Sequence, residues 1–154
     1  MEGAVKEVIS TALIILVALG LYSGLRLVLH TNMPLVVVVS GSMEPVFYRG
    51  DVVVLEGVKP EDVKIGDVVV YKSPLAKYPI IHRVREIKEI VVNGREELCF
   101  VTWGDNNPIP DLYPTPAGVL DCVPQQAIEA KALLVIPKIG WISIKLREIF
   151  GLGG

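Results

Sequence analysis

The chain has 154 residues and a formal net charge of −2 at pH 7, so its charge gives no reason to expect nucleic acid as a partner. The length suffices for one domain with a hydrophobic core, and hardly for two. Hydrophobic residues make up 51% of the chain and the mean hydropathy is +0.51, which excludes an ordinary soluble domain. The apolar excess must therefore lie in a particular segment.

Residues 8–25 form an uncharged apolar run of 18 residues. As a helix it would be about 27 Å long, close to the thickness of a bilayer's hydrocarbon core. A buried core helix would usually carry a polar stripe, which this run lacks. A cleaved signal peptide is the other alternative, since Ala18-Leu19-Gly20 fits a small-x-small cleavage pattern, but the apolar run continues beyond it. The sequence favours a membrane anchor at 1–32, with the span at about 8–25.

The remaining residues, 33–154, predict a β-rich domain. Short apolar runs rich in β-branched residues predict strands at 35–40, 51–57 and 67–71. The segment 80–90 alternates, so Ile81, Arg83 and Arg85 should face one way and His82, Val84 and Glu86 the other. Asn93-Gly94 predicts a hairpin that pairs this strand with 91–103.

The composition changes over residues 104–124, which contain five prolines. This predicts an ordered, non-repetitive loop rather than a strand, and long loops of this kind are often functional. Residues 125–137 predict a returning strand, and 140–150 a short amphipathic helix too charged to span a bilayer. The predicted fold class is mainly β, with an antiparallel sheet preceded by one N-terminal transmembrane helix.

The chain contains two cysteines, Cys99 and Cys122. They form one disulfide if the domain lies outside the cytosol, or two free thiols if it does not, and the sequence leaves both open. Neither has a neighbour at metal-ligand spacing, and the two histidines, His30 and His82, are far apart. No metal site is predicted.

A serine nucleophile needs a base, a group that orients the base, and donors for the oxyanion. Candidates for these roles are Ser42 in a glycine-containing turn, His82 in a strand, and Asp105 and Asp111 in the proline-rich loop. Each also has a structural explanation, because a lone strand histidine is usually structural or solvated and loop aspartates usually form turns.

Four blocks occur in one order after the apolar helix: "SGSMEP" (40–45), "GDVVVY" (66–71), "IHRV" (81–84) and "GDNNPIPD" (104–111). Together they resemble type I signal peptidase, the membrane-bound serine protease that removes signal peptides. The bacterial branch of that family has Lys-Arg where this chain has His82-Arg83. The chain therefore resembles the branch found in archaea and the endoplasmic reticulum. A histidine base suits a wetter site, since its reference pKa is about 6.5 and that of lysine about 10.4.

The resemblance implies a role for each matched residue. Ser42 is the expected nucleophile and His82 its general base. Asp111 is expected to orient His82, in preference to Asp105, which is expected to brace the loop. Arg83 follows the base directly and is expected to have a secondary role.

The resemblance also implies an oxyanion hole formed by the Ser40 hydroxyl and the Ser42 N–H. The alternative for Ser40 is a strand-end serine that satisfies its own backbone. Gly41 is expected to let the two serines turn sharply, and Met43 and Pro45 to shape the wall around the nucleophile.

The implied function is removal of signal peptides from exported precursor proteins, with cleavage after small residues and without a cofactor. An extended substrate could add as a strand to an edge formed by residues 35–39 and 51–55. The implied partners are signal-peptide-bearing precursors, membrane lipid and the secretion translocon. The implied location is the cell membrane, single-pass, with the domain on the extracytoplasmic side. Two alternatives are a specialised processing peptidase of the same fold, acting on pilins or conjugation factors, and a non-enzymatic membrane-tethered β module.

Overall fold

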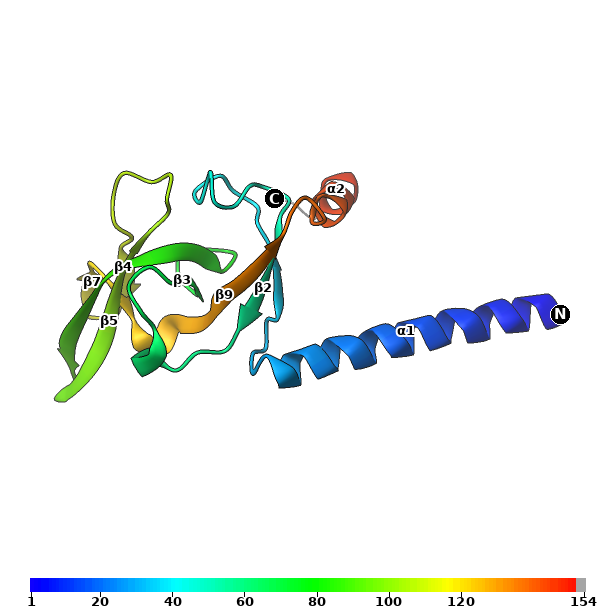
Figure 1. The fold of residues 1–154 in the computed structure, drawn as a ribbon, viewed down its shortest axis with the longest axis horizontal. Helices are drawn as coiled ribbons and strands as arrows, with labels where there is room; N and C mark the ends of the chain where they lie inside the picture. The colour runs from blue at the N-terminus through cyan, green and yellow to red at the C-terminus, as the bar shows by residue number, and fades with distance from the viewer. Residues whose placement is uncertain (152–154) are drawn as a thin grey trace.

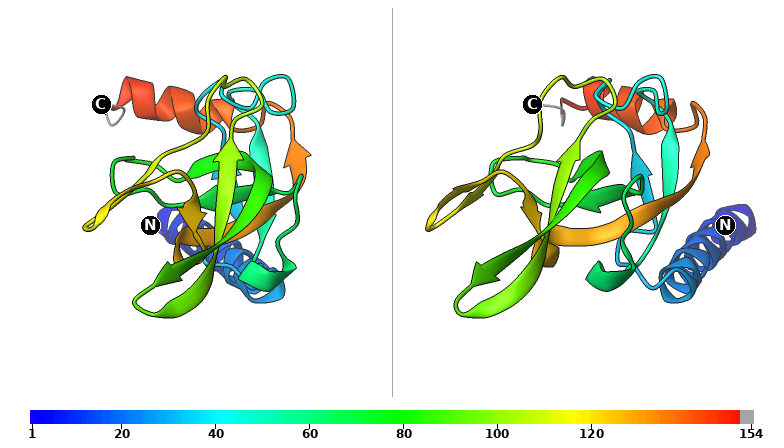
Figure 2. Two further views of the ribbon diagram at one scale, coloured as in Figure 1. Left: turned by 90° about the vertical axis from the view of Figure 1, so that its left-hand side faces the viewer. Right: turned by 60° about the vertical axis from the view of Figure 1, so that its left-hand side comes forward.

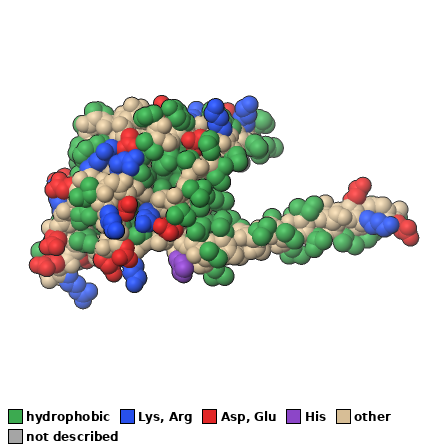
Figure 3. All heavy atoms as spheres, in the orientation of Figure 1, with side chains coloured by type: hydrophobic (Ala, Val, Ile, Leu, Met, Phe, Trp, Pro, Cys, Tyr) green, Lys and Arg blue, Asp and Glu red, His purple; other side chains and the backbone are tan. Residues whose placement is uncertain are grey.

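The computed structural model describes residues 1–151, and its first element is the helix α1 (Glu2–Val28). The helix extends away from the rest of the chain (Figure 1). Its most apolar 18-residue window has a mean hydropathy of 2.2, and none of that window is buried. Hydrophobic side chains follow it along its length, with charged side chains at its free end (Figure 3). A core helix is thereby excluded, and α1 is long and apolar enough to cross a membrane.

The domain is built on one curled, antiparallel sheet of seven strands, seen from three sides in Figures 1 and 2. The strands are β1 (Leu35–Val37), β2 (Val52–Glu56), β3 (Val68–Tyr71), β4 (Ile80–Val92), β5 (Arg95–Trp103), β8 (Val123–Pro124) and β9 (Ile128–Ile136). Their order across the sheet is β1-β2-β9-β3-β4-β5-β8. The predicted strands and the mainly β fold class are confirmed, although β1 is shorter than predicted.

The proline-rich loop differs from the prediction. It contains β6 (Tyr113–Thr115) and β7 (Gly118–Leu120), which form a separate two-stranded ladder, and it also contains β8. The expectation of a loop without strands is therefore wrong. Pro114 lies inside β6 and pairs with Val119. A two-stranded ladder leaves each strand with a free edge, where the missing N–H of a proline costs nothing.

The alternation in β4 is confirmed only as far as Val84. His82 and Val84 are buried on one face, and Arg83 is less buried on the other. The pairing with β5 then shifts register, because Val84 is opposite Thr102 and Glu86 opposite Val101. Arg85 is the extra residue of this bulge, and Glu86 is exposed instead of following His82 inward.

The core lies inside the curl of the sheet. Its largest cluster is formed by residues that are all less than 9% exposed: Val38, Met43, Phe47, Val53, Leu55, Val68, Val70 and Ala130. Two short 3₁₀ turns, η1 (Pro60–Asp62) and η2 (Gln125–Ala127), connect strands at the periphery. Met43 and Phe47 belong to the turn after β1, so the core fixes the segment that carries the nucleophile candidate.

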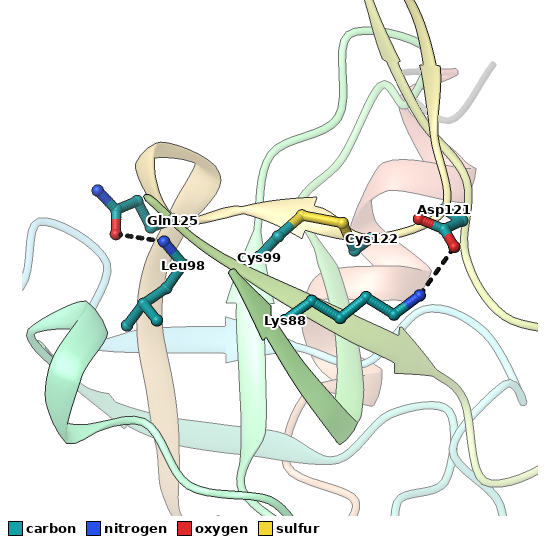
Figure 4. Close-up of a disulfide and its surroundings, with 6 residues drawn as sticks. All are labelled: Lys88, Leu98, Cys99, Asp121, Cys122 and Gln125. Carbon is teal, nitrogen blue, oxygen red and sulfur yellow. Dashed lines mark hydrogen bonds and ion pairs between the residues drawn. A yellow bond between two sulfur atoms is a disulfide. The ribbon is translucent and has the colours of Figure 1, made fainter. Parts of the chain in front are cut away.

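Cys99 of β5 and Cys122, just before β8, form a disulfide (Figure 4). Lys88 pairs with Asp121 beside it at 2.8 Å, and the Leu98 N–H donates to Gln125 Oε1 at 3.1 Å. The two possibilities left open by the sequence are thus resolved in favour of pairing.

The predicted amphipathic helix is found as α2 (Trp141–Ile149). The Gly140 N–H donates to the Gly50 carbonyl at 2.7 Å, and Arg49 forms an ion pair with Glu148 at 3.0 Å. These contacts seat α2 on the end of the turn after β1. Residues 152–154 of the predicted domain lie outside the described residues.

Candidate active site

Ser42 lies in the turn that follows β1, and the proline-rich loop fixes its backbone. The Asn106 N–H donates to the Ser42 carbonyl at 2.9 Å, and Asn106 Nδ2 donates to the Gly41 carbonyl at 3.1 Å. Met43, the next residue, is completely buried. Hydrogen bonds from Asn106 therefore fix the backbone at Ser42, and the burial of Met43 in the core fixes the residue that follows it.

Three side chains form a hydrogen-bonded row. Ser42 Oγ lies 3.1 Å from His82 Nε2, and His82 Nδ1 lies 2.6 Å from Asp111 Oδ2. A carboxylate only accepts, so Nδ1 carries the proton and the Nε2 lone pair faces the serine. The structure thus brings together Ser42, His82 and Asp111, from the turn after β1, from β4 and from the proline-rich loop.

Asp111 also accepts two hydrogen bonds from the interior. The Tyr71 hydroxyl donates to Asp111 Oδ2 at 2.9 Å, and Thr102 Oγ1 donates to the same oxygen at 2.7 Å. Burial, and next the charge of Asp111, raise the pKa of Tyr71 far above its ordinary value. The Asp111 N–H donates to the Thr102 carbonyl at 2.8 Å, which fixes the loop beside β5. Sequence reasoning did not single out Tyr71 or Thr102, because nothing in the chain order indicates that they meet Asp111.

Asp105 has different neighbours. Arg83 binds it through two hydrogen bonds, Nε to Oδ1 at 2.9 Å and Nη2 to Oδ2 at 2.7 Å, and Arg85 also contacts Oδ1. The hydrogen bond from Arg83 holds the pKa of Asp105 below its ordinary value. Arg83 Nη1 further donates to the Gly66 carbonyl at 2.8 Å. Asp105 thus joins β4 to the loop, whereas Asp111 contacts His82.

Gly104 is a further residue of the site that sequence reasoning did not single out. A Cβ atom at this position would lie 2.2 Å from the Ser42 carbonyl oxygen and 3.0 Å from His82 Nε2. No larger residue fits there without moving the nucleophile or the base. The only signal in the sequence was its place at the start of the "GDNN" turn.

Ser40 lies with its Oγ 3.2 Å from Ser42 Oγ, and its side chain is exposed. Among the described residues, no acceptor takes a hydrogen bond from the Ser42 N–H. Gly41 does not adopt a positive φ, so its freedom in the left-handed region is not used. Met43 is buried in the core and Pro45 is exposed, and neither lines the groove at Ser42.

A groove of about 500 Å³ opens at Ser42 and His82. Its lining includes residues 35–40 and residues 78–82. Successive side chains of a strand point to opposite faces of the sheet, yet consecutive residues of β1 line the groove. The groove is therefore bordered by the edge of β1 rather than by one of its faces. Among the described residues, β1 pairs only with β2, and residues 80–82 pair only with β3, since β5 joins β4 from Arg83 onward. Two unpaired strand edges therefore border one groove.

An apolar helix able to span a membrane, a curled antiparallel sheet and a Ser–His–Asp row beside a groove define a membrane-associated serine hydrolase. No family model matches the chain. The chain is similar to the signal peptidase complex catalytic subunit SEC11 of Komagataella phaffii, at 39% identity over 92% of the chain and 83% of that protein. The same-named protein of Schizophyllum commune is 34% identical over 92% of the chain and 79% of its own length. The human subunit SEC11C is 32% identical over 92% and 72%. The chain belongs to this family of signal peptidase catalytic subunits, as the four sequence blocks predict, and it is a protease.

Proposed function

We propose that the chain is a membrane-bound serine endopeptidase that removes signal peptides from precursor proteins, with Ser42, His82 and Asp111 as its catalytic residues. The observation that carries this assignment is the unbroken hydrogen-bonded row from Ser42 Oγ to Asp111 Oδ2 beside the groove. A non-enzymatic tethered module would not need this arrangement. The Ser42 hydroxyl and the His82 imidazole both lie within hydrogen-bond distance of their neighbours in the row.

His82 serves as the general base. Its Nε2 takes the proton from Ser42 Oγ while the oxygen forms a bond to the scissile carbonyl carbon. The same nitrogen then gives the proton to the leaving amine, which breaks the peptide bond and leaves an acyl group on Ser42. Water, deprotonated by His82, releases the acyl group in the second half of the reaction. Asp111 keeps the proton on Nδ1 and stabilises the imidazolium.

The oxyanion hole is formed by the Ser40 hydroxyl and the Ser42 N–H. Both lie at the nucleophile, and the N–H has no other acceptor among the residues described. Each such donor stabilises the transition state by about 3 kcal/mol in other proteases. Ser40 would rotate its hydroxyl from Ser42 Oγ to the oxyanion when substrate binds.

The substrate binds as an extended strand between the two unpaired edges. β1 and residues 80–82 offer backbone donors and acceptors on both sides of it. The sequence also suggested β2 as an edge, which is wrong, because β2 pairs with β1 on one side and β9 on the other. Val36 and Val37 of β1 line the groove, and their bulk favours small residues before the cleaved bond.

The anchor at 1–32 holds a catalytic domain at 33–154, and the domain acts on the extracytoplasmic side of the cell membrane. The disulfide supports this side, since such bonds persist in oxidising compartments. Lipid surrounds α1, and the translocon delivers the precursor. The names of the relatives also suggest that the chain works as the catalytic subunit of a complex. Protease added to sealed vesicles of known sidedness should digest the domain only from the extracytoplasmic side, and digestion from the cytoplasmic side alone would reverse the topology.

Cleavage of a secretory precursor by detergent-solubilised protein tests the assignment. Wild type should cut after a small residue, and Ser42→Ala, His82→Ala and Asp111→Ala should each lose activity by about 10⁴-fold or more. Asp105→Asn is the matched control, because it changes the other loop aspartate and should retain cleavage at a reduced rate. Activity of Ser42→Ala equal to that of wild type would refute the proposal.

A further inference from the structure

The carboxylate of Asp111 has an unusual set of donors. Its Oδ2 accepts from His82 Nδ1, from the Tyr71 hydroxyl and from Thr102 Oγ1, all at 2.9 Å or less. Asp111 Oδ1 accepts no hydrogen bond from the described residues. Tyr71 is 1% exposed and Thr102 is fully buried, so both donors approach from the core.

Tyr71 is held rigidly for this contact. It ends β3, opposite Ile80 of β4 and Ile128 of β9, and its ring packs against Val123 and Ala127. Its ring therefore cannot follow Asp111 if the loop moves. Thr102 lies in β5, opposite Val84, and its carbonyl accepts from the Asp111 N–H. One oxygen of a loop residue is thus fixed by two hydroxyls on two strands of the sheet.

Burial and the nearby negative charge keep Tyr71 protonated, so its hydroxyl donates throughout the working pH range. A carboxylate oxygen that already accepts two hydrogen bonds attracts the proton of a third donor, here His82 Nδ1, less strongly than an oxygen without them. Asp111 therefore orients the His82 ring without holding the ring too firmly in its protonated form, which could not act as a base.

We propose that Tyr71 is a positioning residue of the active site. With Thr102 it fixes Asp111 Oδ2 and weakens the attraction of this oxygen for the His82 proton, so that His82 can take the serine proton. This role rests on the proposed function of Ser42, His82 and Asp111. Tyr71 touches neither Ser42 nor the groove, and it acts only through Asp111.

The titratable and charged groups around this unit come from three elements. His82 and Arg83 belong to β4, Tyr113 to β6, and Asp105 to the loop, where Arg83 and Arg85 pair with it. Asp105 already forms ion pairs with both arginines. Because Arg83 lowers its pKa, Asp105 stays ionised over the pH range in which a histidine titrates. A change in the pH profile on altering Tyr71 therefore reports on Asp111 and His82.

Tyr71→Phe, which keeps the ring and removes the hydroxyl, tests the proposal in the full-length chain. We expect kcat to fall by about 10- to 100-fold, the range for a lost hydrogen bond to a charged group. KM should stay within about twofold of wild type, because the groove is untouched. The acidic limb of the pH profile of kcat/KM should move to higher pH, because Asp111 then stabilises the protonated imidazole more strongly. Thr102→Val should act in the same direction, and Thr102→Ser, which keeps the hydroxyl, should restore most of the activity.

Tyr48→Phe is the matched control, since this tyrosine is exposed and its hydroxyl makes no hydrogen bond among the described residues. A double-mutant cycle supplies the second readout: in an Asp111→Ala background, Tyr71→Phe should have no further effect. A Tyr71→Phe enzyme with the kcat and pH profile of wild type would overturn the inference, as would an equal loss in both backgrounds. Both results are distinct from a failure of the proposed function, in which Ser42→Ala itself would remain active.

Discussion

At the scale of single residues, the two aspartates of the loop show how surroundings assign roles to identical side chains. Asp105 receives two arginines and acts as a brace between β4 and the loop. Asp111, six positions later, accepts hydrogen bonds from one histidine and two neutral hydroxyl groups. An arginine next to Asp111 would compete with His82 for the carboxylate, so the pairing of Arg83 and Arg85 with Asp105 leaves Asp111 to the proposed catalytic histidine.

The brace predicts a dependence of stability on pH. Because Arg83 lowers the folded-state pKa of Asp105, this carboxylate stabilises the fold fully above its unfolded pKa, about 3.9, and progressively less as the pH falls through the lower folded value. Asp105→Asn should lower the free energy of unfolding at pH 7 by about 1–3 kcal/mol. The difference between the two proteins should shrink below about pH 4. Denaturant unfolding in detergent at both pH values measures it, and a difference that does not change with pH would contradict the brace.

At the scale of elements, the disulfide and the proline-rich loop work together. Cys99 and Cys122 are 23 residues apart, and the loop that they close carries Gly104, Asp105 and Asp111. The loop's ends are thus tied at β5 and β8, while Asn106, near its start, ties it to Ser42. A loop rich in prolines and closed by a covalent bond has few conformations to lose on folding, which suits a segment that must place Asp111 accurately.

The disulfide should therefore stabilise the domain by about 3 kcal/mol, the value for a closed loop of this length. A reducing agent should lower the melting temperature of wild type. A variant with Cys99→Ala and Cys122→Ala should already melt low and should not respond to the reductant, which makes it the control. Equal melting temperatures for oxidised and reduced wild type would show that the bond contributes nothing.

At the scale of the whole molecule, the end of α1 is held close to the β-rich domain. The Gly57 N–H, just after β2, donates to the Leu29 carbonyl at 2.7 Å, one residue beyond the end of α1. A Cβ on Gly57 would lie 2.1 Å from the His30 carbonyl oxygen, so the chain passes too closely for any other residue. Under the proposed function, this junction would fix how far Ser42 lies from the membrane surface, where the cleavage site of a precursor would emerge.

Gly57→Ala should therefore separate two activities. Cleavage of a membrane-inserted precursor should fall by up to about 100-fold, because Ser42 would no longer lie at the level of the scissile bond. Cleavage of a short soluble peptide should change little, since the Ser42–His82–Asp111 row is distant from the junction. Gly20→Ala, where a Cβ would meet nothing within 4 Å, is the control. Equal losses on both substrates would show that Gly57 supports the domain itself.

Much of this protein follows from local patterns in the sequence. The charge-free run at 8–25 predicts α1, because hydropathy and length are local properties. The β-branched runs predict the main strands, and Asn93-Gly94 predicts the turn between β4 and β5. The blocks around Ser42 and His82 also identify the family, because residue order alone carries that signal.

The tertiary structure decided whatever depends on which distant segments meet. It paired the cysteines, placed β2 inside the sheet rather than at an edge, and brought β1 and residues 80–82 to the same groove. It also brought Tyr71 to Asp111 across 40 positions of sequence. Such contacts are set by strand order and register, which the period of a single strand does not encode. The sequence by itself thus determined the apolar helix, the main strands and the reactive residue types, whereas the strands of the proline-rich loop and the neighbours of each site residue were decided by the fold.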